Sequence, residues 1–383
     1  MRLLEYEGKS VFDQSGIDVP SGEVVESPSE AEDVCAKVGP PVMLKAQVPT
    51  GGRGKAGGIV SADSPEETRR EAERLLNGSL SGNPVDQLLV EEQLNIEEEL
   101  YCGLIVDTSA GEVKYLFSRQ GGVDIEQIAE NNPEALHETT IDLNRGFPAY
   151  QAMNVMRKSG FSGSLLKELA GVSSSLYHAF NTHDMIMVEI NPLVITEEER
   201  VIAADSVVEL DDNSLFRNPS FDKDSPRSRL GDRLEKEAFD LGVNSFVKLD
   251  GEVGIVASGA GLGMATMDIL SNHGSGPANF LETGGNISTE LIDGSLKLVS
   301  QHENVRGIIV NLYGGINPMV DAAEGVVKAV HEGLGNLPVV TKLLGNQQEE
   351  AWGLLEEAGL PVVKTVYTED AVQQLLEVIG EET

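Results

Sequence analysis

The sequence has 383 residues, 40% of them hydrophobic, and a formal net charge of −35 from 63 acidic and 28 basic residues. This length predicts two or three domains. So acidic a surface repels nucleic acid and anionic lipid, which excludes both as partners. A stretch of about 18 apolar residues, as a membrane span needs, is absent. The first ten residues lack the apolar core of a signal peptide, so we expect a cytoplasmic protein.

The acidic excess has two explanations. One is simple solubility, because a large net charge keeps proteins apart in solution. The other is adaptation to a high-salt cytoplasm, in which dissolved ions screen the repulsion between like charges. We favour the halophilic explanation, which predicts that stability depends on KCl concentration.

Helical and strand patterns alternate along the chain, which is typical of α/β architecture. An amphipathic helix is expected over 2–15. Ser27-Pro28-Ser29-Glu30 and Ser64-Pro65-Glu66-Glu67 each combine a capping serine, a proline in the first turn and a glutamate three positions on. This combination predicts two helix starts. Between them, 41–48 is predicted to be a strand and 51–58 a glycine-rich loop.

Further along, 99–106 and 112–118 predict a β-hairpin, and 162–180 a helix. Met185–Thr196 and Arg200–Asp205 predict a pair of strands. The two cysteines, Cys35 and Cys102, lack the spacing of metal ligands, and we expect both to be buried and inert.

A polar stretch with two prolines, Arg217 to Asp232, is the best candidate for a domain break. We predict a first domain at 1–225, a linker at 226–242 and a second domain at 243–383. In the second domain, helical stretches separate apolar runs, which predicts a doubly wound parallel sheet. These runs lie at 253–257, 308–312, 339–344 and 362–366.

The glycine-rich loop is a candidate phosphate site. Its glycines let backbone N–H groups approach phosphate oxygens, while Lys45, Arg53 and Lys55 supply positive charge. It is not a Walker loop, because the GxxxxGK[ST] pattern is absent. The alternative is a flexible hairpin with solvated cations, but basic residues are scarce in this chain, and we favour phosphate binding.

The predicted strand pair holds candidate metal ligands. Glu189 and Asn191 are two residues apart, so a strand turns both to one face. If Ile195 pairs with Val201, Asn191 lies opposite Asp205. Amide and carboxylate oxygens suit Mg²⁺. The alternative is an ordinary hairpin with polar residues on its wet face.

Residues 253–263 predict a strand, a glycine turn and a helix, as in a dinucleotide-binding fold. Glu282 lies where such a fold places its ribose acid, about 20 residues on. An NAD-dependent dehydrogenase is therefore an alternative function, although Met264 stands where the third glycine is needed. Near the C-terminus, Gly314-Gly315 precedes a helix expected near Pro318, whose N-terminus would attract an anion.

Several segments, in the same order, resemble the β subunits of succinyl-CoA synthetase. They lie at 3–7, 45–58, 121–126, 189–194, 259–262 and 311–316. The resemblance spans nearly the whole chain. It implies an N-terminal ATP-grasp fold followed by a flavodoxin-like domain. It also implies the β subunit of an NDP-forming acyl-CoA ligase, which couples ATP or GTP to succinyl-CoA formation and cleavage.

The resemblance assigns roles by position. Nucleotide binding is implied for Lys45, Gly52, Arg53, Gly54, Glu91, Leu94 and Glu99. The cofactor Mg²⁺ is assigned to Asn191 and Asp205. Glu189 is assigned as the catalytic group that contacts a histidine of the partner subunit. The acid substrate is assigned to Ser258, Gly315, Ile316 and Asn317.

The resemblance also implies an α subunit that carries the phosphohistidine and the main CoA site, in an αβ or α₂β₂ assembly. None of the 6 histidines lies in the family's Gly-His-Ala-Gly motif. The acid site departs from the family pattern, with Ser258 in place of asparagine and Asn317-Pro318 after the glycine pair. Succinate is our first choice, and malate or another short-chain carboxylic acid is the alternative. A non-catalytic nucleotide-sensing subunit is a further alternative.

Overall fold

The computed structural model describes residues 1–49, 51–80, 82–123, 125–219, 221, 227, 230, 232–243 and 245–381. Thr50 and Asp124, within two of the predicted motifs, and most of 220–231 lie outside the described residues. The chain divides into two compact units, Met1–Pro226 and Arg227–Thr383. No helix in the described ranges is long and apolar enough to cross a bilayer.

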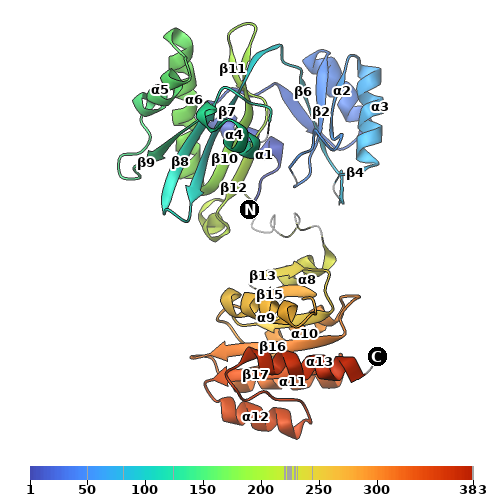
Figure 1. The fold of residues 1–383 in the computed structure, drawn as a ribbon. Helices are drawn as coiled ribbons and strands as arrows, with labels where there is room; N and C mark the ends of the chain where they lie inside the picture. Colours follow the sequence, from blue (N-terminus) through green and yellow to red (C-terminus); the bar gives the residue numbers. More distant parts are fainter. Residues whose placement is uncertain are drawn as a thin grey trace. The chain divides into compact units, whose positions relative to one another are not determined.

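The first unit contains two antiparallel sheets (Figure 1). The smaller consists, in spatial order, of β1 (Gly22–Val25), β6 (Leu88–Glu92), β2 (Val42–Ala46) and β3 (Ile59–Ala62). One of its faces is covered by α2 (Pro28–Val38) and α3 (Pro65–Leu76). Cys35 and Leu75 of these helices pack in one hydrophobic core with Leu44 and Val90 of the sheet. A small two-stranded sheet, formed by β4 (Ser79–Leu80) and β5 (Asn83–Pro84), follows α3.

The larger sheet of this unit has six strands. Its spatial order is β11 (Val201–Ala203), β10 (Met185–Thr196), β7 (Ile96–Asp107), β8 (Glu112–Ser118) and β9 (Leu136–Ile141), and β12 (Val207–Leu210) also pairs with β10. Three helices contribute to the core on one face: α1 (Glu5–Gln14), α5 (Ala149–Lys158) and α6 (Gly163–Thr182). Shorter helical segments are α4 (Ile125–Asn131), η1 (Pro133–Ala135) and η2 (Asp212–Arg217).

Strand periodicity determines which side chains of this sheet point away from the hydrophobic core and are available to form a functional site. Leu100, Cys102 and Leu104 of β7 lie in the hydrophobic core. Side chains alternate between the two faces of a strand, so Tyr101 and Gly103 turn to the opposite face. Val188 and Ile190 of β10 are in the same core, and Glu189 between them shares the face of Tyr101. The polar face is therefore set by the alternation predicted for these strands.

The second unit is a doubly wound sheet, as predicted. Its spatial order is β13 (Ser245–Lys248), β15 (Asn279–Glu282), β14 (Val253–Ala257), β16 (Gly307–Gly314) and β17 (Val339–Gly345). The edge strand β13 is antiparallel, and the other four are parallel. The chain reverses its winding direction between β14 and β16. Ligands of such sheets bind beyond the carboxyl ends of the strands near this point.

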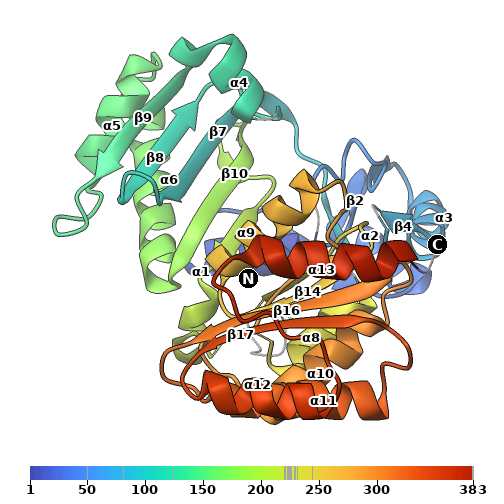
Figure 2. The ribbon, with the colours of Figure 1, turned by 60° about the horizontal axis from the view of Figure 1, so that its bottom comes forward.

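Helices cover both faces of this sheet (Figure 2). On one face lie α9 (Ala260–Asn272) and α13 (Thr368–Glu381). On the other lie α8 (Arg233–Leu241), α10 (Thr289–Ser300), α11 (Met319–Glu332) and α12 (Gln348–Glu357). The strands β14, β16 and β17 are largely buried, which explains why they read as continuous apolar runs.

Two expectations for this half of the chain were wrong. The segment 226–242, expected to be a linker, contains α8, whose Leu234 and Ala238 are buried in the core of the second unit. The apolar run at 362–366 is not a regular strand, because only Val362 forms a bridge, to Thr341. After that bridge the chain no longer pairs with the sheet, and it continues to α13, which begins at Thr368.

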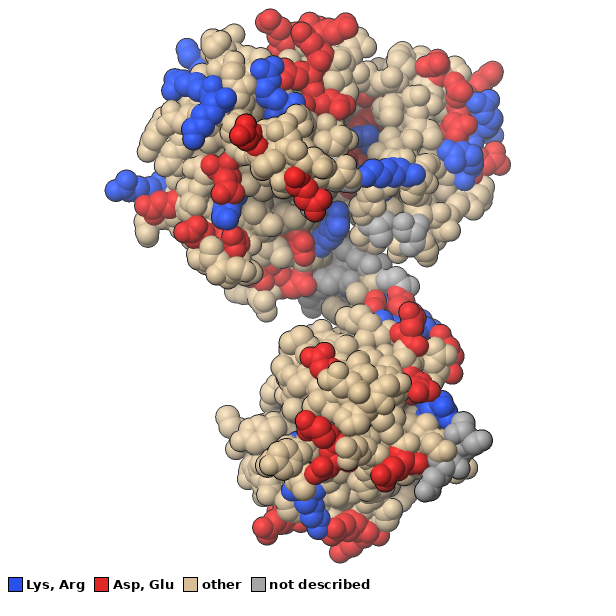
Figure 3. Space-filling view, viewed as in Figure 1, with Lys and Arg blue, Asp and Glu red and all other residues tan. Residues whose placement is uncertain are grey.

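Acidic side chains are spread over the face of each unit that Figure 3 shows. Exposed carboxylates are stabilised mainly by water and dissolved ions, and exposed ion pairs contribute little to stability. Among the described residues, few charged side chains are buried: Glu5, Lys9, Lys45, Arg53 and Glu91 in the first unit, and Glu282, Asp293 and Lys342 in the second.

Candidate functional site

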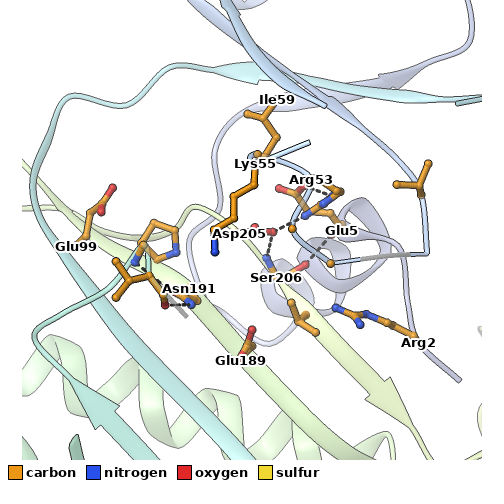
Figure 4. Close-up of a pocket in the computed structure, with 18 of the residues that line it drawn as sticks. Arg2, Glu5, Arg53, Lys55, Ile59, Glu99, Glu189, Asn191, Asp205 and Ser206 are labelled. Carbon is orange, nitrogen blue, oxygen red and sulfur yellow. Dashed lines mark hydrogen bonds and ion pairs between the residues drawn. The ribbon is translucent and has the colours of Figure 1, made fainter. Parts of the chain in front are cut away.

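A cavity of about 410 Å³ in the first unit is lined by residues from both of its sheets (Figure 4). The glycine-rich loop contributes Arg53 and Lys55, and the larger sheet contributes Glu189 and Asn191. The cavity is lined by many of the residues predicted to bind nucleotide or metal, and by the predicted catalytic residue Glu189: Gly52, Arg53, Gly54, Glu99, Glu189, Asn191 and Asp205. Four separate segments of the chain thus bring polar side chains to one place.

Strand register places Asn191 opposite Asp205, as predicted. β10 pairs with β11 through Ile195↔Val201 and Leu193↔Ala203. It pairs with β12 through Glu189↔Val207, which continues the same register. Asn191 and Asp205 therefore lie across from one another in the short gap between the two ladders. Both side chains line the cavity.

The two side chains are held by local hydrogen bonds. Asn191 Oδ1 accepts from the Gly122 backbone N–H at 2.8 Å, and its Nδ2 donates to the Val123 carbonyl oxygen at 3.0 Å. Asp205 Oδ1 accepts from the Ser206 backbone N–H at 2.7 Å and from Arg53 Nη2 at 2.9 Å. These contacts orient an amide oxygen and a carboxylate at the same cavity, which is the hard oxygen donor set that Mg²⁺ prefers.

A cluster of buried charges lies beside the cavity. Glu5 Oε1 lies 2.8 Å from Lys9 Nζ and 2.9 Å from Lys45 Nζ, and Glu5 Oε2 lies 2.7 Å from Arg53 Nη1. Glu91 joins it, with one oxygen 2.6 Å from Lys45 Nζ and the other 2.6 Å from Lys9 Nζ. We call Glu5, Lys9, Lys45, Arg53 and Glu91 the buried charge cluster. Each charged group in it has a partner of opposite sign, and its third cation, Arg53, also pairs with Asp205.

The cluster perturbs the acidity of its members. Burial alone would raise the pKa of Glu5, but the charges of Lys45, Lys9 and Arg53 outweigh it and lower that pKa. Burial opposes the charge of Lys45, but Glu5, Glu91 and Asp205 raise its pKa. Burial, followed by the nearby Glu5 carboxylate, raises the pKa of Asp205 above its ordinary value, against the pull of Arg53. A cation bound near Asp205 would favour its ionised form.

Three residues with predicted nucleotide roles do not line the cavity. Lys45 and Glu91 lie in the buried charge cluster, and Lys45 Nζ also donates to the Ala204 carbonyl oxygen at 2.7 Å. The three N–H groups of Lys45 therefore all have acceptors. Leu94 lies half-buried in the segment between β6 and β7. Contact between these residues and a nucleotide stays a prediction.

Sequence reasoning missed several residues of this site. Glu5 lines the cavity, and so do Arg2 and Ser206. Glu5 and Lys9 form an ion pair at the i, i+4 spacing of a helix, a signal that the sequence does contain. Arg2 and Ser206 come from segments whose approach to the glycine-rich loop depends on the tertiary fold, and no local pattern marks them.

In the second unit, the residues assigned to the acid substrate lie at the carboxyl edge of the sheet. Ser258 follows β14, and its hydroxyl accepts from the Tyr313 N–H at 2.8 Å and donates to the Tyr313 carbonyl oxygen at 3.1 Å. It therefore joins β14 to β16 where the winding reverses. Asn317 Nδ2 donates to the Gly285 carbonyl oxygen, and α11 begins at Met319, as expected near Pro318.

Large apolar side chains are exposed at this same edge. Ile316 is 90% exposed, and Tyr313 beside it is exposed as well. Val366 and Tyr367 are exposed just before α13, whose Thr368 accepts from Asn311 of β16 at 3.1 Å. Apolar side chains gathered around polar loops are typical of a surface that another protein covers.

The dinucleotide-binding alternative finds no support in the second unit. Glu282, expected to reach a ribose, is buried, and its Oε2 accepts from the Gly284 backbone N–H at 3.0 Å. Glu282 is the cross-strand partner of Ala257 at the end of β14, but its buried carboxylate is engaged by its own loop.

Comparison with known proteins places the two units in established families. A model described as an ATP-grasp domain matches residues 2–195, and one described as CoA-ligase matches 234–376. The GDP-forming succinate–CoA ligase subunit β of Thermus thermophilus is 40% identical, over 99% of both chains. The chain belongs to the succinate–CoA ligase β-subunit family. The ADP-forming counterparts of Ignicoccus hospitalis and Haloarcula marismortui are 38% and 39% identical, each over 98% of both chains.

A solved structure has the same fold over nearly the whole chain. ATP citrate lyase from Methanothrix soehngenii, in complex with citrate and coenzyme A, matches with a TM-score of 0.73 over 98% of this chain and 99% of that chain. At 17% identity this likeness concerns the fold alone. The family thus confirms the predicted order of an ATP-grasp domain followed by a CoA-ligase domain.

Proposed function

We propose that this chain is the nucleotide-binding β subunit of an NDP-forming acyl-CoA ligase that interconverts succinate and succinyl-CoA. The observation that carries the proposal is the cavity of the first unit. Four segments of the chain, which carry Arg53, Glu99, Glu189 with Asn191, and Asp205, line one space. Its chemistry fits a polyphosphate and the histidine that accepts a phosphoryl group from it.

The glycine-rich loop and its cations bind the phosphates in this proposal. Arg53 and Lys55 face the cavity beside Gly52 and Gly54, whose backbones can approach phosphate oxygens closely. Lys45 contributes positive charge from behind the loop. Glu99, which is exposed and also lines the cavity, accepts hydrogen bonds from the ribose hydroxyls. ADP and ATP are the nucleotides we expect, and GTP is the alternative.

Asn191 and Asp205 would hold Mg²⁺. Their oxygen atoms fit this ion, and the Arg53 guanidinium beside Asp205 links the metal ligands to the phosphate loop. When bound, Mg²⁺ supplies charge neutralisation for the phosphate oxygens. The residues of the chain keep the ligands oriented through the backbone of 122–123 and Ser206.

The histidine comes from a partner α subunit in this proposal. All six histidines of the chain are within the described residues, and none lines the cavity. Glu189 faces the cavity and is the group that receives the incoming imidazole. The exposed apolar side chains at the carboxyl edge of the second unit support a partner there, with CoA and the acid bound at the shared surface. We expect an αβ or α₂β₂ assembly.

The identity of the acid substrate depends on the residues at the carboxyl edge of the second unit. Ser258 and Asn317 depart from the family pattern, and both engage backbone atoms of neighbouring loops. A pocket with different hydrogen-bonding groups discriminates by leaving wrong substrates unpaired. Malate, or another short-chain acid, is therefore the second candidate substrate.

The test is acyl-CoA formation by the chain reconstituted with its α subunit. Succinate, malate and other short-chain acids are each supplied with CoA, Mg²⁺ and either ATP or GTP. We expect succinyl-CoA at the highest kcat/KM. A preference for malate would replace the substrate but keep the ligase. No product with any acid, despite nucleotide binding, would support a subunit that only senses nucleotide.

A further inference from the structure

Tyr101 on β7 contacts the carboxylate of Glu189 on the neighbouring strand β10. The Tyr101 hydroxyl donates to Glu189 Oε2 at 3.2 Å. Tyr101 is only 4% exposed, so its packing fixes where the hydroxyl lies. Glu189 is half-buried and lines the cavity, where Figure 4 shows its side chain. A buried phenol thus holds one oxygen of a carboxylate that reaches the site.

Gly103 provides the space for this contact. It is the direct cross-strand partner of Glu189 and lies two residues from Tyr101, on the same face of β7. A Cβ atom at Gly103 would lie 2.8 Å from the Tyr101 hydroxyl oxygen and 3.2 Å from the Val188 carbonyl oxygen. The backbone of Gly103 is not in the left-handed region, so its conformation does not require glycine. Glycine within a strand weakens it and is found where another group approaches closely.

We propose that Tyr101 is a positioning residue for Glu189, and that Gly103 is the glycine that permits it. The inference rests on the proposed function, in which Glu189 receives the histidine of the partner. A glutamate side chain rotates about several bonds, whereas a reacting constellation must be held to within about 0.5 Å. The hydrogen bond from a fixed phenol removes part of that freedom. The side chain is then oriented before the imidazole arrives.

A purely structural role for Tyr101 would give different kinetics. Loss of fold stability lowers the amount of active protein and affects nucleotide binding and phosphoryl transfer together. Loss of positioning slows transfer while nucleotide still binds, because the phosphate loop and the metal ligands are untouched. Comparing the two constants therefore separates the two roles.

The experiment measures phosphoryl transfer from ATP to the histidine of the α subunit in a single turnover. It also measures the dissociation constant of ATP by calorimetry. Tyr101→Phe keeps the ring and removes the hydroxyl. We expect the transfer rate to fall about tenfold or more, as for a lost hydrogen bond to a charged group. The dissociation constant of ATP should stay within about twofold, because transfer and not binding is affected.

Gly103→Ala is the second variant, and it leaves the Tyr101 side chain chemically unchanged. The added methyl group would displace the Tyr101 hydroxyl, so the transfer rate should fall as in Tyr101→Phe. Combining the two changes should lower the transfer rate little more than either change alone, because both remove the same hydrogen bond.

Tyr115→Phe is the matched control. Its hydroxyl contacts Ser173 at 2.8 Å on the helix-covered face of the sheet, so stability should fall and the transfer rate should not.

Three outcomes would overturn the inference. Transfer by Tyr101→Phe at the wild-type rate would mean that the hydrogen bond does not orient Glu189. Loss of ATP binding in parallel with transfer would make Tyr101 a structural residue. Absence of transfer in the wild-type pair would contradict the proposed function, and the inference would fall with it.

Discussion

Glu5 is a buried carboxylate held between the cations Lys9, Lys45 and Arg53. Removing one partner of a buried ion pair leaves the others uncompensated and typically costs about 3–5 kcal/mol. We expect Glu5→Gln to lower the free energy of unfolding of the first unit by about that amount, measured by urea denaturation. Glu66→Gln, at an exposed position in the first turn of α3, is the matched control. Equal effects of the two changes would contradict a structural role for the buried charge cluster.

The same carboxylate makes stability depend on pH in the acid range. The neighbouring cations lower the pKa of Glu5 below its ordinary value of 4.5, despite its burial. A group whose pKa is lowered by folding contributes stability that is complete above the unfolded-state value and is lost as the pH falls through the folded-state value. Wild-type protein should therefore lose more stability than Glu5→Gln as the pH drops below about 4.5.

Asp205 is the residue on which the proposed metal site depends most. Asp205→Asn keeps the size of the side chain and removes the negative charge that a divalent cation needs. We expect the Mg²⁺ concentration required for nucleotide binding to rise about tenfold or more, since a contact to a charged group is lost. Calorimetric titration of ATP at several Mg²⁺ concentrations measures this. An unchanged magnesium requirement, with the fold intact, would show that Asp205 is not a ligand.

For individual residues, the sequence predicted the relative positions of side chains that share a strand or a hairpin, such as Glu189, Asn191 and Asp205. Their relation follows from strand periodicity and one cross-strand pair, Ile195↔Val201. It did not predict the contact between Glu5 and Arg53, because these residues lie in different segments and meet only through the tertiary fold. Nor did it predict that Lys45 would be surrounded by acceptors.

Helix starts are the elements that local chemistry predicts best. Ser27 accepts a hydrogen bond from the Glu30 N–H, and Glu30 accepts in return from the Ser27 N–H at 3.1 Å. Ser27→Ala removes one of these contacts and should lower the free energy of unfolding by about 1 kcal/mol. Ser29→Ala, two positions on and exposed, is the control and should change it little. Equal urea midpoints for the two variants would argue against the cap.

Elements that depend on distant partners were predicted less well. The short strands β13 and β15 have no period long enough to recognise, and they are fixed by pairing with each other. The helix α8 was not predicted, because its many charged residues made the segment resemble a linker. Only Leu234 and Ala238, four residues apart, mark the face that it buries. The central strands were found because burial on both faces requires continuous apolar runs.

The whole molecule carries a net charge of −35, and acidic groups are visible over both units in Figure 3. Raising KCl from about 0.1 M to about 1 M shortens the screening length from about 10 Å to about 3 Å. Repulsion between carboxylates should weaken, and the unfolding temperature should rise. Scanning calorimetry across this range tests the halophilic explanation. An unfolding temperature independent of KCl would leave solubility as the reason for the charge.

The central claim is that this chain binds the nucleotide while the accepting histidine belongs to another subunit. The most direct measurement incubates the purified chain with γ-labelled ATP and Mg²⁺, alone and together with its α subunit, and locates the label. We predict acid-labile phosphate on a histidine of the α subunit only when both chains are present. Stable labelling of a histidine in this chain alone, or acyl-CoA formation without the α subunit, would contradict the claim.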